Sequence, residues 1–241
     1  MPLENLKDRI RKGKLTLGVS VPWDSTKEEI QRIWSQDKDY NFISIDSQHN
    51  PLDESKIASI SHDAAELGIP VHFRIKHTNY TWQIGNWLDL GPTMIEVPQT
   101  EKVSTAQEAI DYFYYSPAGK RSWGGTSRIE INDRPDRLAY ASWWNTFGVL
   151  WLQVESLQAI SNIPKFALPG IDCISWGPAD LSFDREANPH HPLSISDQAC
   201  IDYAFKLLEN SHVQLVLRNY NWRERDKFIE MGAKVILERP K

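Results

Sequence analysis

The sequence is poor in cysteine and contains no long apolar run. Its two cysteines, Cys173 and Cys200, are far apart and lie in apolar surroundings, so we expect buried thiols rather than a disulfide or a zinc site. No stretch approaches the roughly 20 apolar residues of a membrane span, and the charged start of the chain does not resemble a signal peptide. These absences predict a soluble protein of the cytoplasm.

An excess of positive charge is also missing. The chain has 27 Lys and Arg against 32 Asp and Glu, a net charge of −5, with the two signs interspersed. This balance gives no reason to expect a nucleic-acid partner. With 241 residues and neither a linker nor an internal repeat, residues 1–241 are expected to form one large α/β domain.

Short apolar segments recur along the chain and alternate with helical patterns. Eight of them read as buried strands, at residues 15–21, 42–46, 71–75, 94–98, 149–155, 171–176, 213–217 and 234–238. This alternation predicts a (β/α)₈ TIM barrel. The chain stops three residues after the last segment, so the eighth helix is absent, and the first helix or another subunit is expected to cover the last strand.

Helical patterns and irregular stretches fill the intervals between these strands. We expect helices at residues 2–14, 24–33, 51–67, 80–88, 102–115, from 156 onward, 195–208 and 222–231. The first helix is expected to cap the bottom of the barrel. Two irregular stretches are expected at residues 117–144 and 184–192, and long loops of this kind are usually functional or disordered.

Two of the strand segments end at a carboxylate. Glu155 ends the segment 149–155, and Asp180 follows the segment 171–176 after a Gly-Pro turn. Because the carboxyl ends of parallel strands form one rim of the barrel, these two acids are expected to lie side by side. Two oxygen ligands with open positions suit a catalytic divalent cation. Alternatively, each acid is a helix N-cap.

Other polar groups stand at the same ends of strands. His49 follows the second segment and Arg74 lies in the third. Each is more often structural when it occurs alone, but a base, a fixed cation and two acids on one rim together predict a functional site. The chain has ten tryptophans, and Trp176 is a candidate to line the site because its strand leads to Asp180.

Several motifs taken together resemble the HpcH/HpaI aldolases, a family of class II pyruvate aldolases. The most specific are Leu152-Gln-Val-Glu155 and Gly177-Pro-Ala-Asp-Leu-Ser182. The others are Ile45-Asp-Ser-Gln-His49, Phe73-Arg-Ile75, Leu88-Asp-Leu-Gly91, Pro98 and Gly119-Lys-Arg121 with Arg128. The resemblance covers about residues 6–233 and also implies a (β/α)₈ barrel.

The resemblance implies a reaction and a cofactor. The reaction is the reversible retro-aldol cleavage of a 4-hydroxy-2-oxo acid to pyruvate and an aldehyde through a metal-bound pyruvate enolate. Glu155 and Asp180 would be the metal ligands, and Mg²⁺, Mn²⁺ and Co²⁺ all suit two carboxylates and substrate oxygens. Arg74 would stabilise the enolate oxygen, because arginine does not lose its proton. His49 would be the acid/base, with Asp89 as its orienting partner, supplied within the chain or across a subunit interface.

The same resemblance implies where pyruvate binds. Gln153 points the same way as Glu155 along the strand, and the backbone N–H groups of Ala179 and Asp180 would receive the carboxylate. The residues that would contact the aldehyde half of the substrate are less clearly defined. They are Arg121, Arg128, Trp123 and the His190-His191 loop, for which a solvated surface loop is an equal alternative.

The sequence also departs from the family pattern. Gln48 stands where the family usually has glutamate, which removes one charge near the metal. Ser20 stands where an aromatic residue is common, and the strand at 213–217 lacks the usual glycine. The resemblance implies a homo-oligomer, but without the last helix a hexamer, a dimer and a trimer all stay open.

The sequence is also compatible with three alternative functions. A Schiff-base aldolase would use Lys76, although no lysine lies in the strands at 149–155 and 171–176. A decarboxylase of oxaloacetate or a related lyase would use the same metal enolate. A non-catalytic barrel that acts in binding or assembly would explain Gln48 and the surplus of tryptophan.

Overall fold

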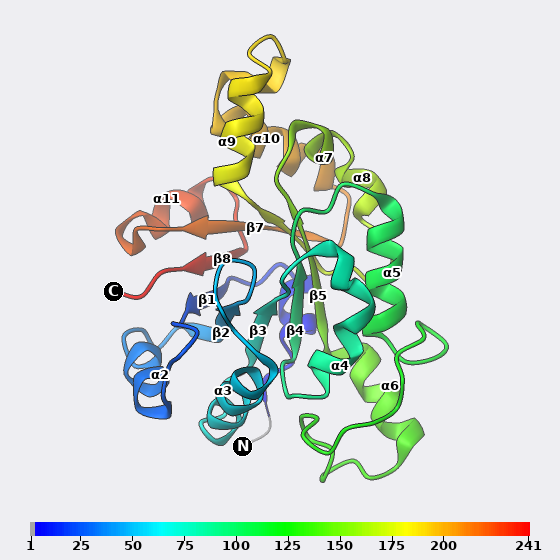
Figure 1. Cartoon of the computed structure of the whole chain (residues 1–241). Coiled ribbons are helices and arrows are strands. Elements are labelled where there is room, and N and C mark those ends of the chain that lie inside the picture. Colours follow the sequence, from blue (N-terminus) through cyan, green and yellow to red (C-terminus); the bar gives the residue numbers. More distant parts are fainter. Residues whose placement is uncertain (1–2) are drawn as a thin grey trace.

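The computed structural model describes residues 3–241, which contain a closed barrel of eight strands (Figure 1). The strands are β1 (Thr16–Ser20), β2 (Tyr40–Asp46), β3 (Val71–Arg74), β4 (Met94–Val97), β5 (Val149–Val154), β6 (Cys173–Trp176), β7 (Gln214–Asn219) and β8 (Val235–Glu238). Neighbouring strands are parallel, and β1 pairs with β8 to close the ring. The predicted (β/α)₈ barrel is confirmed.

The helices lie around the outside of the barrel, except for α1, which precedes the first strand (Figure 1). They are α1 (Leu6–Arg11), α2 (Lys27–Trp34), α3 (Glu54–Glu66), η1 (Thr78–Gln83), α4 (Ile84–Leu88), α5 (Val103–Phe113), α6 (Arg137–Phe147), α7 (Leu157–Ser161), α8 (Ile163–Phe166), α9 (Pro178–Ala187), η2 (Pro192–Ile195), α10 (Asp197–Leu208), η3 (Trp222–Glu224) and α11 (Arg225–Glu230). Residues 239–241 after β8 contain no helix. Among residues 3–241, no helix combines the length and apolarity that a bilayer crossing requires.

The interior of the barrel is filled by side chains from alternate strand positions. Leu6 and Ile10 of α1 form one buried cluster with Met94, Val149 and Val235, which begin β4, β5 and β8. Helix α1 therefore closes the amino-terminal end of the barrel, as expected, although it is shorter than the predicted 2–14. Pro2 at the start of that prediction lies outside the described residues. Both cysteines are free and buried, as expected.

The last strand is covered from two sides, because Leu6 and Ile10 of α1 pack in one cluster with Val235 and Leu237. All four residues of β8 are buried, and Ile236 belongs to the main hydrophobic core. On the outer side, Arg225 of α11 donates to both carboxylate oxygens of Glu238, at 3.0 and 2.5 Å. Helix α11 thus covers part of this strand in addition to α1, which was the expected cover within the chain.

Two predicted irregular stretches contain helix. Helix α6 occupies the end of the 117–144 stretch, and Asp136 caps it by accepting a hydrogen bond from the backbone N of Ala139 at 2.7 Å. Its buried residues are Tyr140, Ala141, Trp144 and Phe147. That spacing is helical, so the pattern was present in the sequence. Helix α9 likewise extends to Ala187, into the predicted loop at 184–192.

A buried ion pair fixes α1 beneath the barrel. Lys7 donates to the hydroxyl of Tyr114 at 2.7 Å, to the carbonyl of Gly148 at 2.5 Å and to Asp172 at 2.9 Å. Arg11 bonds to the other oxygen of Asp172 at 2.8 Å. Burial lowers the pKa of Lys7, and the neighbouring Asp172 opposes that shift. The positive charge of Lys7 therefore depends on Asp172.

Asp172→Asn is expected to destabilise the fold. Removing one partner of a buried pair leaves an uncompensated charge, which costs about 3–5 kcal/mol of unfolding free energy. Urea unfolding measures this loss. The matched control is Asp8→Asn, because Asp8 pairs with Lys12 on the exposed side of the same helix and exposed pairs contribute little. Equal midpoints for the two variants would contradict a stabilising role for the buried pair.

Candidate active site

The two predicted acids lie at neighbouring strand ends. Glu155 directly follows β5 and is 6% exposed, while Asp180 lies in the first turn of α9, after β6. The N-cap of α9 is Gly177, so Asp180 is not the capping residue. Glu155 Oε2 accepts a hydrogen bond from the backbone N of Gln99 at 3.0 Å. Burial, followed by repulsion from Asp180, raises the pKa of Glu155 to about 7.

Gly177 lets the turn after β6 approach the end of β5. A Cβ atom at this position would lie 2.4 Å from Cγ of Glu155 and 3.0 Å from Nε2 of Gln153. The backbone N of Gly177 donates to the carbonyl of Val154 at 3.1 Å. Any side chain at position 177 would therefore displace Glu155 and Gln153, and the Gly-Pro turn fixes the acid pair in place.

Arg74 is held on two sides at the end of β3. Its Nε and one terminal nitrogen donate to the two oxygens of Asp46 at 2.8 and 2.7 Å, and the other terminal nitrogen donates to Gln153 Oε1 at 3.2 Å. Burial alone would lower the pKa of Arg74, but the bonds to Asp46 and the charge of Glu96 raise it. The guanidinium is thus both fixed in orientation and permanently charged.

Asp46 is a site residue that the sequence reading did not assign. Besides Arg74, it accepts from the backbone N of Gln48 at 2.9 Å, and its backbone carbonyl accepts from Asn50 at 3.1 Å. It therefore shapes the turn that bears His49, an exposed residue. The sequence contained a signal for this role. Asp46 is two residues after Ser44 in β2, so both side chains point into the barrel, and Asp46 belongs to the motif that contains His49.

These groups share one cavity at the carboxyl ends of the strands. The cavity has a volume of about 390 Å³, within the usual range of small-molecule sites. Its lining includes six predicted site residues, which are His49, Arg74, Gln153, Glu155, Ala179 and Asp180. A second cavity of about 700 Å³ also borders Glu155 and Asp180. The acid pair is therefore accessible from both cavities.

A buried charge network lies beneath this cavity. Arg218 of β7 donates through one terminal nitrogen to both oxygens of Glu96 in β4, at 2.5 and 2.7 Å. Ser175 also bonds to Glu96, and His72 lies 3.6 Å from it. Burial would raise the pKa of Glu96, but Arg218 above all lowers it to about 2. This network was not predicted from the sequence. The available signal was Glu96, a charged residue within the otherwise apolar strand β4.

His72 is expected to make the protein sensitive to acid. It is fully buried, bonds to Ser44 at 2.9 Å, and burial lowers its pKa to about 4 from an ordinary 6.5. The unfolded chain therefore binds a proton between these two values that the folded chain does not. The contribution of His72 to the unfolding free energy is complete above pH 6.5, and about 3 kcal/mol of it is lost as the pH falls towards 4, which appears as the difference between the unsubstituted protein and His72→Gln. Urea unfolding at pH 7.5, 6, 5 and 4 measures this loss.

His72→Gln should flatten this pH dependence, whereas the matched change His62→Gln should leave it unaltered, because His62 is exposed on α3. The same slope in His72→Gln and in the unsubstituted protein would show that His72 does not cause the acid loss. The network of Glu96 adds a separate loss in the same direction, between pH 4.5 and 2.

Three other predicted residues lie in a cluster outside the cavity. Asp89 at the end of α4 accepts from Arg121 at 2.7 Å, and burial raises its pKa although Arg121 opposes the shift. The Arg121 guanidinium lies over the rings of Tyr115 and Trp144, at 4.8 and 4.6 Å from their centroids. Arg128 belongs to the same cluster. Within one chain, these residues do not join His49 and Arg74 in the cavity lining.

Arg128 and the remaining predicted residues also lie outside the cavity. Arg128 stacks over Trp123 at 3.8 Å. Trp176 is 3% exposed and packs in the main core, because its neighbour Ser175 takes the inward position of β6. His191 caps η2 and borders a separate cavity, and His190 is exposed.

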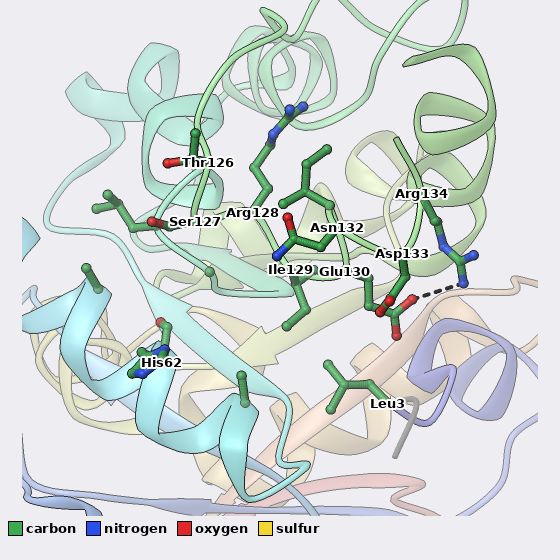
Figure 2. A pocket seen from close by; sticks show the side chains of 16 residues that line it. Leu3, His62, Thr126, Ser127, Arg128, Ile129, Glu130, Asn132, Asp133 and Arg134 are labelled. Atoms are coloured by element: carbon green, nitrogen blue, oxygen red, sulfur yellow. Dashed lines mark ion pairs between the residues drawn. The ribbon is translucent and has the colours of Figure 1, made fainter. Parts of the chain in front are cut away.

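A cavity larger than the strand-end cavity lies elsewhere in the molecule. It measures about 940 Å³ and lies between α3 and residues 126–134. Figure 2 shows His62 on one side and the loop on the other, with Glu130 and Arg134 joined by an ion pair of 2.9 Å. Of the predicted site residues it includes only Arg128. This cavity therefore contains none of the residues predicted to bind the metal or pyruvate.

The acid pair fits a divalent cation that takes its remaining ligands from substrate and water. Among residues 3–241, no group of three His, Cys, Asp or Glu side chains is arranged to hold a metal. Burial, and after it the nearby Asp180, nevertheless raise the pKa of Glu155, so ionising Glu155 in the metal-free site is costly. A bound cation would relieve that repulsion, and two carboxylates with open positions suit Mg²⁺ or Mn²⁺.

Comparison with known proteins defines the class. The family model of HpcH/HpaI aldolase/citrate lyase matches residues 39–194, and the chain belongs to this family. A hydroxypyruvate/pyruvate aldolase of Pseudomonas aeruginosa is 25% identical over 97% of this chain and 85% of its own length. A 4-hydroxy-2-oxo-heptane-1,7-dioate aldolase of Escherichia coli is 31% identical over 63% of this chain, a match that spans 57% of that relative.

Solved structures show the same fold. An HpcH/HpaI aldolase from Desulfitobacterium hafniense superposes with a TM-score of 0.82 at 21% identity, over 98% of this chain and 90% of that one. A citrate synthase superposes with a TM-score of 0.79 at 20% identity, over 98% and 91%. These matches support the barrel architecture, and the family assignment supports an aldolase or lyase activity.

Proposed function

We propose that this protein is a divalent-metal-dependent aldolase that cleaves a 4-hydroxy-2-oxo acid to pyruvate and an aldehyde. The observation that supports this most directly is the placement of Glu155, Asp180 and Arg74 around one cavity at the strand ends. The two relatives named above are both aldolases by name.

Glu155 and Asp180 would hold the cation, which is Mg²⁺, Mn²⁺ or Co²⁺. When bound, the cation withdraws electrons from the 2-oxo group and stabilises negative charge on its oxygen. Gln99 and Gly177 keep Glu155 in position for this role, the first by a hydrogen bond and the second by its lack of a side chain.

Arg74 supplies a second stabilising charge for the enolate oxygen. Its two bonds to Asp46 fix the guanidinium before substrate binds, so no reorganisation is needed when charge develops. Gln153 accepts from Arg74 through its oxygen, which leaves its amide N–H groups for the substrate. The backbone N–H groups of Ala179 and Asp180, at the start of the ten-residue helix α9, would receive the pyruvate carboxylate.

His49 would transfer the proton of the 4-hydroxyl. It lines the mouth of the cavity and is exposed, so it can reach the part of the substrate that becomes the aldehyde. An imidazole titrates near neutrality and suits both directions of the reversible reaction. Asp89 would orient His49 of a second copy of the chain in a homo-oligomer, because within one chain Asp89 is bonded to Arg121.

Mixing two inactive variants tests this shared site. His49→Ala and Asp89→Asn are each expected to lose most cleavage activity. After mixed refolding, activity should return to at most about a quarter, because some sites then combine an intact His49 with an intact Asp89 of the neighbour. Size-exclusion chromatography would confirm mixed assembly. Assembly without any recovery of activity would rule out the exchange of Asp89 between subunits.

A Schiff-base mechanism receives no support from the lining of the strand-end cavity. Lys76 is exposed after β3, and among residues 3–241 no lysine borders this cavity. Borohydride trapping with pyruvate should therefore leave the protein unlabelled.

Proton exchange at the methyl group of pyruvate is the decisive assay for the proposed function. In deuterated water, NMR should show loss of the methyl proton signal with enzyme and Mn²⁺ or Mg²⁺, and no loss after EDTA. Release of pyruvate from a panel of 4-hydroxy-2-oxo acids would then identify the preferred aldehyde. Absence of exchange with every divalent metal would instead favour a binding or assembly role.

A further inference from the structure

Arg218 reaches the site from the side opposite Arg74. Strands β3 and β7 are four apart in a ring of eight, so the two arginines enter the cavity from opposite walls. Both line the strand-end cavity. The proposed function uses Arg74 and leaves the guanidinium on the β7 wall without a role.

The Arg218 guanidinium is fixed in place but keeps free donors. One terminal nitrogen bonds to both oxygens of the fully buried Glu96, which anchors the group on the cavity floor. Its Nε is enclosed by protein atoms, but the side chain as a whole is 12% exposed and lines the cavity, so its second terminal nitrogen is the donor available to a substrate. An arginine offers five N–H donors in a planar fork, so this side chain can still bind an oxygen acid of the substrate.

A second arginine lies on the same wall. Arg239 follows β8, borders the cavity and stacks over the ring of Tyr220 at 4.7 Å. Its backbone N donates to the carbonyl of Asn219 at 3.1 Å, which joins the ends of β7 and β8. The acid on this wall, Glu238, is already bonded to Arg225 and Asn219. The charge of Arg218 is balanced by Glu96, so an anion entering here would be attracted mainly by the exposed Arg239 and would meet Arg218 as a fixed hydrogen-bond donor.

We propose that Arg218 and Arg239 form a binding site for an acid group, carboxylate or phosphate, on the aldehyde half of the substrate. This inference depends on the proposed function, in which Arg74, Gln153 and the start of α9 hold the pyruvate half. The rest of the cavity, towards β7 and β8, then receives the other half. Charge-assisted hydrogen bonds to a fixed arginine select strongly for an anion over a neutral group of similar size.

Matched aldehydes test this selectivity in the condensation with pyruvate. Succinic semialdehyde is compared with butanal for a carboxylate, and glyceraldehyde 3-phosphate with glyceraldehyde for a phosphate. The enzyme is expected to favour the acid member of one pair at least tenfold in kcat/KM, and the favoured pair identifies the acid group. Pyruvate proton exchange is measured in parallel, because it reports enolate formation without any aldehyde.

The variants are designed around the buried partner. Arg218→Gln alone would leave Glu96 unpaired, so the test uses Glu96→Gln with Arg218→Gln, and separately the exposed Arg239→Gln, which leaves the core intact. Either change is expected to raise KM for the acid aldehyde at least tenfold. The rate with the neutral aldehyde, divided by the pyruvate exchange rate of the same variant, should not change. Arg223→Gln is the control, because Arg223 stacks on Trp222 and does not line the cavity.

The outcomes separate this inference from the proposed function. Normal pyruvate exchange with no preference for either acid aldehyde, or a preference that survives in both variants, would overturn the acid-binding site and leave the aldolase proposal standing. A complete lack of exchange would overturn the aldolase proposal, and the inference would fall with it.

Discussion

Glu155→Gln is expected to abolish pyruvate proton exchange and to weaken divalent metal binding a hundredfold or more. Glu155 would supply one of only two charged ligands. Substituting a residue that merely hydrogen-bonds to a metal ligand lowers metal affinity roughly 10–100-fold, and removing a ligand itself should lower it more. Calorimetric titration with Mn²⁺ measures the affinity, and NMR measures the exchange. The variant should fold normally, because glutamine resembles the protonated carboxyl that the buried site favours.

The unfolding free energy of Glu155→Gln is also expected to differ from that of the unsubstituted protein. Burial and Asp180 raise the pKa of Glu155 to about 7 from 4.5, so in the metal-free protein its ionised form costs stability as the pH rises through this window. Glutamine removes that cost, and metal-free Glu155→Gln should be at least as stable at pH 7.5. Glu101→Gln is the matched control, because Glu101 borders the neighbouring cavity and bonds to Ser156. Unchanged metal affinity in Glu155→Gln would refute the ligand assignment.

Arg74→Ala is expected to reduce pyruvate proton exchange by about 10²–10³-fold, the usual effect of removing one group that stabilises an oxyanion. Arg74→Lys should not restore the rate, because an ammonium group cannot form the two parallel bonds to Asp46 and also reach Gln153. Metal affinity should change much less than the rate, since Arg74 is not a ligand.

The control for Arg74 lies on the same end of the barrel. Arg223→Ala removes an exposed arginine that is stacked on Trp222, and its exchange rate should match that of the unsubstituted enzyme. Circular dichroism and the urea midpoint would verify that Arg74→Ala remains folded. Full exchange activity in a folded Arg74→Ala would exclude a role for this guanidinium in enolate formation.

Local periodicity explains why the barrel and part of the site could be predicted. Each strand is a short apolar run, and the residue that ends it must lie on the rim of a parallel barrel, which places Glu155 near Asp180 without any long-range information. The alternation of side chains likewise places Gln153 beside Glu155. Trp176 shows where this reasoning fails. It was expected to line the site because its strand leads to Asp180, but the alternation of side chains along β6 directs Trp176 outward into the main core.

Contacts between distant segments could not be predicted in this way. The pairing of Glu96 with Arg218 joins residues 122 positions apart, and it depends on an arginine that crosses the floor of the barrel. The pairing of Asp89 with Arg121 depends on the path of an irregular loop. In both cases the residue type was visible in the sequence, but its partner was set by tertiary structure.

The central claim is that one cation lies between Glu155 and Asp180 and faces Arg74. A crystal structure with Mn²⁺ and pyruvate, analysed by anomalous scattering at the manganese edge, tests it most directly. The account predicts one strong peak within bonding distance of both carboxylates, with pyruvate between that peak and Arg74. A peak bound to neither acid, or no peak in the strand-end cavity at saturating Mn²⁺, would contradict it.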